Sequence, residues 1–343
     1  MSVPDAYTLR AYAPGDEAAI QRAFTAVFGV ERSDAEWRWK FLEPPRGARI
    51  LLAFDAAGEL VCQYAAITVD VTWAGAPMQG AQIVDVLARR RRGLGPRGGA
   101  FQPTMERFLA ECAAANGVAF VYGFPGERHQ RAGAVTGHYF DPVEVERLSR
   151  RLPLARDTAA ANRWSPARSW ISEGFDAHAT DRLWRRSRAR YPNATVRDAA
   201  WFQWRYERRP GGRYLQLGVR RAGETRAWGV IAPGAGAGHT LWVDLLWDGE
   251  QVADLVDLAA AVEERALAGA ARLVTEARGA HDEGAVDLWL RGDLEARSAL
   301  LERGYAGTPE PHLRLSAITF DPRISVPQVL TGFYLTMGDS DHF

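Results

Sequence analysis

The sequence has almost no lysine and little cysteine. Lys40 is the only lysine among 42 basic residues, so arginine supplies nearly all the positive charge, as is typical of a GC-rich genome. Cys62 and Cys112 lie in a strand-like and a helix-like run. Two such cysteines exclude a disulfide framework and a thiolate metal site. We expect both to be packing residues of a protein from a reducing cytoplasm.

Long apolar runs and net charge are also missing. No uninterrupted apolar run approaches the ~18 residues of a membrane span, and the opening MSVPDAYTLR has no apolar signal segment. The 42 basic and 42 acidic residues cancel, so the chain lacks the positive field of a dedicated nucleic-acid binder. No two histidines stand at metal-ligand spacing. We expect no membrane, nucleic-acid or metal partner, and the oligomeric state stays open.

What is present is a globular composition of sufficient length for two domains. The 343 residues exceed the roughly 100–200 of a typical domain. Apolar periodicity predicts a strand, two helices, three strands, a glycine-rich loop, a helix, a strand, a helix and a strand. This order predicts an α/β fold of the α+β type with a mixed sheet, in which the early strands are antiparallel and the strand after the loop and helix is parallel to the one before it.

Local signals mark the expected ends of the first elements. The helix in PGDEAAIQRAFTAVFG should stop at Gly29. Ser33 should cap the next helix, SDAEWRWKF, with Glu36 as its capping partner. DAAG, residues 55–58, should join two strands as a hairpin turn.

A sequence repeat divides the chain. WKFLEPPRG from Trp39 and WRYERRPGG from Trp204 share W[KR][FY]xxxPxG, and each leads into two strands. Residues 151–180 are rich in Arg, Ala, Ser and Pro and have no clear periodicity. We predict a tandem duplication with domains at 1–150 and 181–343, joined by a connecting segment at 151–180.

The second copy repeats the order of elements but not the loop. HTLWVDLLW and ARLVTEA are expected as strands, QVADLVDLAAAVEERALAGA and DLEARSALLERGY as helices, and YLTMGDSDHF as a strand-like start with an acidic end. Where the first copy has RRRRGLGPRGG, the second has DGEQ. Tryptophans of the repeated helix are expected in the core rather than in a substrate cage: Trp37, Trp39, Trp201 and Trp204.

The glycine-rich loop has the parts of a phosphate site. Its glycines let backbone amides approach, a helix follows, and arginines add charge. A P-loop is excluded because no lysine follows the glycines. A dinucleotide turn fits Gly93, Gly95 and Gly98 literally but lacks the acidic residue expected ~20 positions on. A loop for the pyrophosphate of acyl-CoA and a solvated basic loop remain.

Arg90 to Gly95 matches RxxGxG, and with the strand IVDVL before it and the long helix after it, the region resembles the GNAT family of N-acetyltransferases. The opening PGDEAAI helix and the late ARSALLERGY resemble the start of a first and the end of a second GNAT unit. The resemblance implies two tandem GNAT-like domains, each a central mixed β-sheet flanked by helices, the second degenerate. It also implies transfer of an acetyl or other acyl group from acyl-CoA to a primary amine, by direct attack in a ternary complex.

The resemblance also assigns the acyl-CoA contacts. The strand Val84–Leu87 would pair with the pantetheine arm, and the amides of residues 93–100 would hold the pyrophosphate. Because Pro96–Gly99 adds turn residues before the helix, the last glycines are expected to form the cradle. The candidate binding residues are Val86, Leu87, Arg90, Arg92, Gly93, Gly95, Arg97, Gly98, Gly99 and Ala100.

Catalytic groups follow from location. Acyl transfer to an amine needs a base, a stabilised oxyanion and often a proton for the thiolate. Family members often have a tyrosine that acts as a general acid at about the position where this chain has Gly133. The candidates are Asp85, Glu127, His129 and Tyr139. For Asp85 a carboxylate bonded within the sheet is the alternative, and for His129 a helix cap or CoA contact.

Two other functions stay open. The missing tyrosine leaves room for a non-catalytic acyl-CoA-binding or scaffold protein. A FemAB-like transfer of amino acids from aminoacyl-tRNA is less favoured, because such proteins lack a good CoA loop whereas this chain has one.

Overall fold

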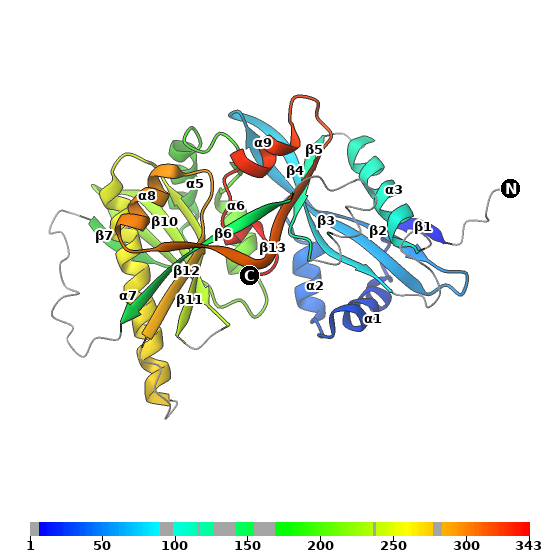
Figure 1. Ribbon diagram of the computed structural model, residues 1–343, viewed down its shortest axis with the longest axis horizontal. Coiled ribbons are helices and arrows are strands. Elements are labelled where there is room, and N and C mark those ends of the chain that lie inside the picture. The colour runs from blue at the N-terminus through cyan, green and yellow to red at the C-terminus, as the bar shows by residue number, and fades with distance from the viewer. Residues whose placement is uncertain are drawn as a thin grey trace. The chain divides into compact units, whose positions relative to one another are not determined.

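The chain forms two compact units, each with a β-sheet and helices packed against it (Figure 1). Unit 1 comprises Met1–Val71, Pro77–Val143 and His312–Leu330, and unit 2 comprises Thr72–Ala76, Glu144–Pro311 and Thr331–Phe343. This computed structural model describes residues 7–89, 99–114, 117–126, 130, 142–153, 169–235, 238–276 and 283–343.

The sheet of unit 1 has the strand order β1-β2-β3-β4-β5-β13. The pairs β1 with β2 and β2 with β3 are antiparallel, β4 and β5 are parallel, and β13 is antiparallel to β5. This confirms the predicted mixed sheet. The bounds are β1 Thr8–Ala11, β2 Ala48–Phe54, β3 Leu60–Trp73, β4 Ala76–Ala88, β5 Val118–Gly123 and β13 Ala306–Thr319.

The helices of unit 1 begin and end at the predicted signals. Helix α1, Glu17–Phe28, stops at Gly29, whose φ of 74° is the left-handed conformation that glycine adopts without strain. Helix α2, Asp34–Phe41, is capped by the Ser33 hydroxyl, which accepts the Glu36 N–H at 3.1 Å. Helix α3 spans Phe101–Ala114, and α9 spans Val326–Gly332.

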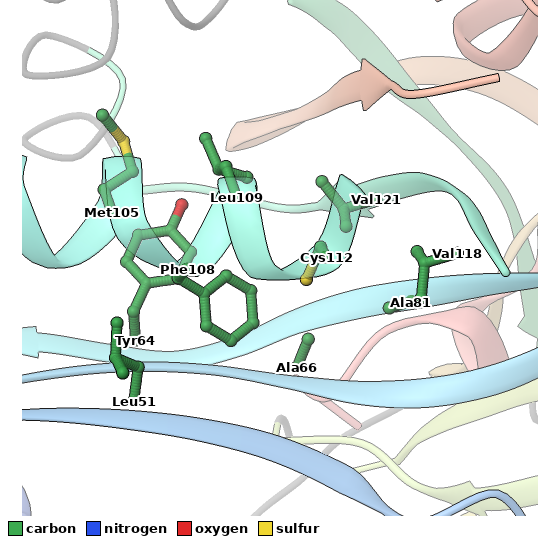
Figure 2. Close-up of a cluster of buried hydrophobic side chains, with 10 residues drawn as sticks. All are labelled: Leu51, Tyr64, Ala66, Ala81, Met105, Phe108, Leu109, Cys112, Val118 and Val121. Carbon is green, nitrogen blue, oxygen red and sulfur yellow. The ribbon is translucent and has the colours of Figure 1, made fainter. Parts of the chain in front are cut away.

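Helix α3 covers one face of the unit 1 sheet. Phe108 and Cys112 project from it toward the strands that carry Tyr64 and Ala81 (Figure 2). The rings of Tyr64 and Phe108 lie 5.0 Å apart between centroids, a contact worth about 0.5–1.5 kcal/mol beyond area burial. This packing fixes where α3 begins relative to the end of β4.

Unit 2 repeats the element order of unit 1. Its sheet runs β13-β6-β12-β11-β10-β9-β7, with β11 and β12 parallel. The strands are β6 Val143–Pro153, β7 Ser169–Glu173, β8 Ala194–Thr195, β9 Leu215–Arg221, β10 Glu224–Pro233, β11 His239–Trp247 and β12 Glu283–Trp289. The helices are α5 Ala177–Ser187, α6 Ala199–Phe202, the π-helix η2 Gln203–Glu207, α7 Val252–Glu276, α8 Leu294–Glu302 and the 3₁₀ turn η3 Met337–Asp339.

The predicted tandem architecture is present, with the last strands exchanged. Strand β6 follows the first repeat along the chain but pairs with β12, and β13 follows the second repeat but pairs with β5. The units therefore differ from the expected domains 1–150 and 181–343, and the expected connection 151–180 includes β7 and the start of α5. The four tryptophans of the repeated helix are buried, as predicted: Trp37, Trp39, Trp201 and Trp204.

One predicted strand of unit 2 is wrong. ARLVTEA, residues 271–277, continues α7 through Glu276, and the strand is β12. Ala266 and Leu273 are seven positions apart, so the sequence keeps the helical period across this stretch. None of the described helices is both long and apolar enough to cross a membrane.

Candidate functional site

Strand β4 extends beyond its parallel partner in unit 1. The pairing with β5 runs from Gln79 opposite Val118 to Gln82 opposite Tyr122. β4 then continues to Ala88, and α3 begins 13 residues later at Phe101. Ligands of α/β sheets bind at the carboxyl ends of parallel strands near a following helix, so this end of β4 is the candidate site.

A bulge interrupts β4 just beyond the paired region. Ala81, Ile83 and Val86 all contact the cluster beneath α3, so the two-residue spacing of one sheet face becomes three across Asp85. Asp85 has φ 47°, an uncommon conformation for a residue with a side chain.

The positive φ of Asp85 lies in a different structural setting from that of the other described non-glycine residues with positive φ. Among the described residues, positive φ outside glycine occurs also at Ala74 and Ala222. Each of these precedes a glycine of positive φ in a two-residue hairpin loop, where such angles are required. Asp85 lies inside a strand, and strain inside an element is often stored at a functional site.

Two cations hold the Asp85 carboxylate. Arg32 Nη1 donates to Oδ2, and Lys40 Nζ donates to Oδ1 at 2.6 Å. The side chains of Arg32, Lys40 and Asp85 are 4%, 11% and 7% exposed. On the backbone, Gln63 Nε2 donates to the Asp85 carbonyl at 3.0 Å. Both partners of this carboxylate lie outside the sheet, Arg32 before α2 and Lys40 within α2, so the role of Asp85 as a base or as a bonded carboxylate stays a prediction.

The described part of the predicted binding segment lies at the two ends of the loop. Val86 packs toward α3, and Leu87 is buried. At the far end, Ala100 accepts hydrogen bonds from the Thr104 N–H at 3.2 Å and the Thr104 hydroxyl at 2.6 Å, which begins α3. A Cβ added at Gly99 would meet no atom of the described residues within 4 Å.

The remaining predicted site residues lie outside the described residues, so their placement stays a prediction. The structure therefore brings together Asp85, Val86 and Leu87 on one strand. Those outside are Glu127, His129, Tyr139, Arg90, Arg92, Gly93, Gly95, Arg97 and Gly98.

Both cysteines of the chain are buried, and Cys62 packs with Ala100 at the start of α3. Burial raises the pKa of the Cys62 thiol to about 12 and that of Cys112 to about 11. The thiolate is the nucleophilic form, so neither residue is suited to carry an acyl group. No group of three His, Cys, Asp or Glu side chains that might hold a metal occurs in the described part of the chain.

Unit 2 has the same strand arrangement. β11 pairs with β12 from His239 to Trp242 and then continues to Trp247. Past the end of β12, Arg291 and Leu335 exchange two backbone hydrogen bonds of 3.1 Å. The Tyr334 hydroxyl donates to the Leu245 carbonyl at 2.6 Å. Residues 334–340, here called the tail segment, thus lie between β11 and the continuation of β12.

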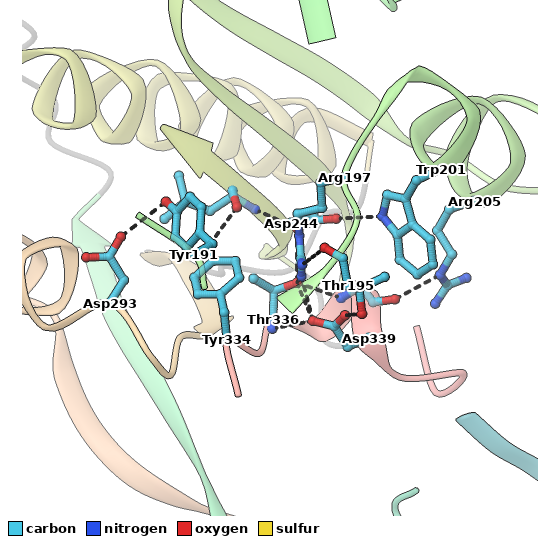
Figure 3. Close-up of polar contacts among 12 residues, drawn as sticks. Tyr191, Thr195, Arg197, Trp201, Arg205, Asp244, Asp293, Tyr334, Thr336 and Asp339 are labelled. Carbon is cyan, nitrogen blue, oxygen red and sulfur yellow. Dashed lines mark hydrogen bonds and ion pairs between the residues drawn. The ribbon is translucent and has the colours of Figure 1, made fainter. Parts of the chain in front are cut away.

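A buried polar network fixes the tail segment (Figure 3). Arg197 Nε donates to Asp244 at 2.8 Å, and its Nη2 donates to Asp339 at 2.5 Å and to Thr336 at 3.0 Å. Burial raises the pKa of Asp339, and Arg197 opposes that shift. A Cβ at Gly338 would lie 2.3 Å from the Tyr206 hydroxyl, so the segment fits closely.

Sequence reasoning missed the cations around Asp85 and the contacts of the tail segment. Arg32 and Lys40 lie 53 and 45 positions from Asp85. They come from the loop before α2 and from α2 itself, and no local motif links them to a strand so far along the chain.

Comparisons with known proteins agree with this architecture. Residues 8–131 match the family model for the acetyltransferase (GNAT) domain. A tandem GNAT protein from the clavulanic acid biosynthesis pathway aligns over 92% of this chain and 99% of its own, with a TM-score of 0.53 and 13% identity. The chain has a tandem GNAT fold.

Other solved structures are similar to this chain over most of its length. A probable N-acyltransferase from Enterococcus faecalis has a TM-score of 0.67 and 14% identity, over 92% of this chain and 72% of its own. Saccharomyces cerevisiae N-myristoyltransferase with bound myristoyl-CoA has a TM-score of 0.52 and 10% identity, over 93% and 84%. At these identities the likeness is one of fold. No curated protein matches the sequence.

Proposed function

We propose that unit 1 binds an acyl-CoA at the end of β4 and transfers its acyl group to a primary amine. The observation that carries this proposal is the end of β4, which lies within the segment that matches the GNAT domain. It has a bulge and, among the described residues, no strand partner on the edge that faces β5. Beyond Gln82, the edge of β4 that faces β5 has no strand partner among the described residues. An extended ligand with amide groups, such as pantetheine, can pair with this edge as an added strand does.

The pyrophosphate of the acyl-CoA is assigned to the start of α3. Free N–H groups and the positive end of the helix dipole favour an anion there. A Cβ at Gly99 would meet no described atom. The arginines of the preceding loop remain part of this proposal as charge partners.

Transfer is direct in this proposal. The amine nitrogen bonds to the thioester carbonyl carbon, the carbon–sulfur bond breaks, the nitrogen loses a proton and the CoA thiolate gains one. Buried cysteines of raised pKa give no support to a covalent acyl-enzyme. Glu127, His129 and Tyr139 are the proposed proton-transfer candidates, since Asp85 is held by two cations.

The test is acetyl-CoA binding, measured as a rise in melting temperature and by calorimetry. Gly99→Asp should lower the affinity about 10- to 100-fold, because it places a carboxylate beside the expected pyrophosphate. Gly99→Ala is the uncharged comparison and should lower the affinity less than Gly99→Asp, since its methyl group meets no described atom and adds no charge. No binding of acetyl-CoA or of longer acyl-CoA esters contradicts the proposal. Binding without thiol release across a panel of amines would favour a non-catalytic role.

A further inference from the structure

The Arg32–Asp85 ion pair of unit 1 has a counterpart in unit 2. The alignment that matches Trp39 with Trp204 places Arg32 opposite Arg197 at the same offset. IVDVL in β4 and WVDLL in β11 align Asp85 with Asp244. β11 also has a bulge, because Trp242 and Asp244 oppose consecutive residues of β10. Each unit thus joins an arginine before its second helix to an aspartate at a bulge.

The two ion pairs are alike in chemistry and burial. Arg197 Nε donates to Asp244, and Arg32 Nη1 donates to Asp85. The Arg197 and Asp244 side chains are fully buried, and those of Arg32 and Asp85 nearly so. Tandem duplication accounts for this, and the aligned arginines differ in the nitrogen that binds the aspartate, Nε in Arg197 and Nη1 in Arg32.

The comparison shows one unmatched atom. In unit 2, Arg197 Nη2 donates to the Asp339 carboxylate and the Thr336 hydroxyl, both of the tail segment. In unit 1, Arg32 Nη2 is buried and has no hydrogen-bond partner among the described residues. A buried donor without a partner is unfavourable and rare in native proteins.

The partners of Arg197 lie where the proposed function places reactants in unit 1. The tail segment lies along β11 beyond the region paired with β12. The corresponding stretch of unit 1 is the end of β4 beyond β5. The tail segment therefore shows, within the same chain, what chemistry satisfies the second guanidinium nitrogen at this position: a carboxylate.

We propose that Arg32 Nη2 binds a carboxylate of the acceptor, so that the acceptor is a primary amine that also carries a carboxyl group, as an amino acid does. This rests on the proposed function. The Arg32 guanidinium is held by Asp85 through Nη1 and by Gln21 through Nε, so Nη2 has a fixed direction, and guanidinium bonds to carboxylates are charge-assisted and directional.

The test compares amino acids with their carboxamides as acceptors for acetyl-CoA. The amine and side chain are unchanged within each pair, and only the carboxyl charge differs. The wild type should favour the acid about 10- to 100-fold in kcat/KM, mainly through KM. Arg32→Lys keeps a cation for Asp85 but removes the second nitrogen, and should bring the ratio close to one with little change for the amide. Arg32→Gln should also bring the acid-to-amide ratio close to one.

Arg197→Lys is the matched control in unit 2, and should leave the acid-to-amide ratio unchanged. Circular dichroism and melting temperature establish that each variant is folded. Equal use of acids and amides by the wild type, or an equal loss for both in Arg32→Lys, overturns the inference. Calorimetry of acid and amide with the CoA complex makes the same comparison without turnover. Failure of the proposed function is distinct, because acetyl-CoA itself then does not bind.

Discussion

The two units have the same order of strands and helices but differ in what lies beside the corresponding strand end. In unit 2 the tail segment lies beside the end of β11, and Arg197 donates to Asp339 of that segment as well as to Asp244 of β11. In unit 1 the aligned Arg32 binds Asp85 and retains a buried nitrogen without a described partner. A repeated fold therefore does not by itself repeat a ligand site. Whether a ligand can bind depends on what lies beside the end of β4 or β11.

The largest effect is expected from removing the arginine of the occupied unit. Arg197→Met leaves Asp244 and Asp339 buried without their cation, which should lower the free energy of unfolding by about 3–5 kcal/mol. Urea unfolding measures this. Arg323→Met is the control, because the ion pair of Arg323 with Asp321 is at the surface and its loss should change the free energy of unfolding little. Equal costs for the two variants would contradict a network that holds the tail segment.

Alanine substitutions of Gly338, in the tail segment, and of Gly99, before α3, should have different effects on stability. Gly338→Ala forces a Cβ against the Tyr206 hydroxyl, and overpacking of this kind typically costs about 1–3 kcal/mol. Gly99→Ala meets no described atom and should change stability by less than about 0.5 kcal/mol. Chemical denaturation of both variants makes the comparison. If Gly99→Ala is more destabilised than Gly338→Ala, the assignment of close packing to Gly338 and of open space to Gly99 is wrong.

The smallest effect is expected from cysteine modification. Because burial raises the pKa of Cys62 to about 12 and of Cys112 to about 11, both thiols should react with iodoacetamide at neutral pH far more slowly than a free thiol. Acetyl-CoA binding should persist after the treatment. Rapid alkylation of either residue, followed with mass spectrometry, speaks against the buried assignment and reopens a covalent route.

The fold was largely predictable because its signals are local. Gly29 ends α1 and Ser33 caps α2 through contacts within a few residues, and largely apolar runs form β2 and β3. The exchange of β6 and β13 was not predictable. Both strands follow the same elements in their repeats and pair antiparallel with a parallel-sheet strand, so either partner satisfies the sequence.

The site was predictable only in part. Position on the strand before the loop singled out Asp85, but its φ of 47° and its two cations depend on contacts across 45 or more positions. The repeat held a usable signal. Extending the tryptophan alignment seven positions toward the N-terminus pairs Arg32 with Arg197. The role of the tail segment had no such signal, since nothing earlier in the chain corresponds to it.

The stoichiometry of acetyl-CoA binding distinguishes one ligand site in unit 1 from a site in each unit. Calorimetry of the full chain measures it, with Gly99→Asp as the variant that should remove the binding. We expect one acetyl-CoA per chain, because the end of β4 has no strand partner beyond Gln82 among the described residues while the tail segment lies beside the end of β11. Two molecules per chain, or one that persists unchanged in Gly99→Asp, would contradict it.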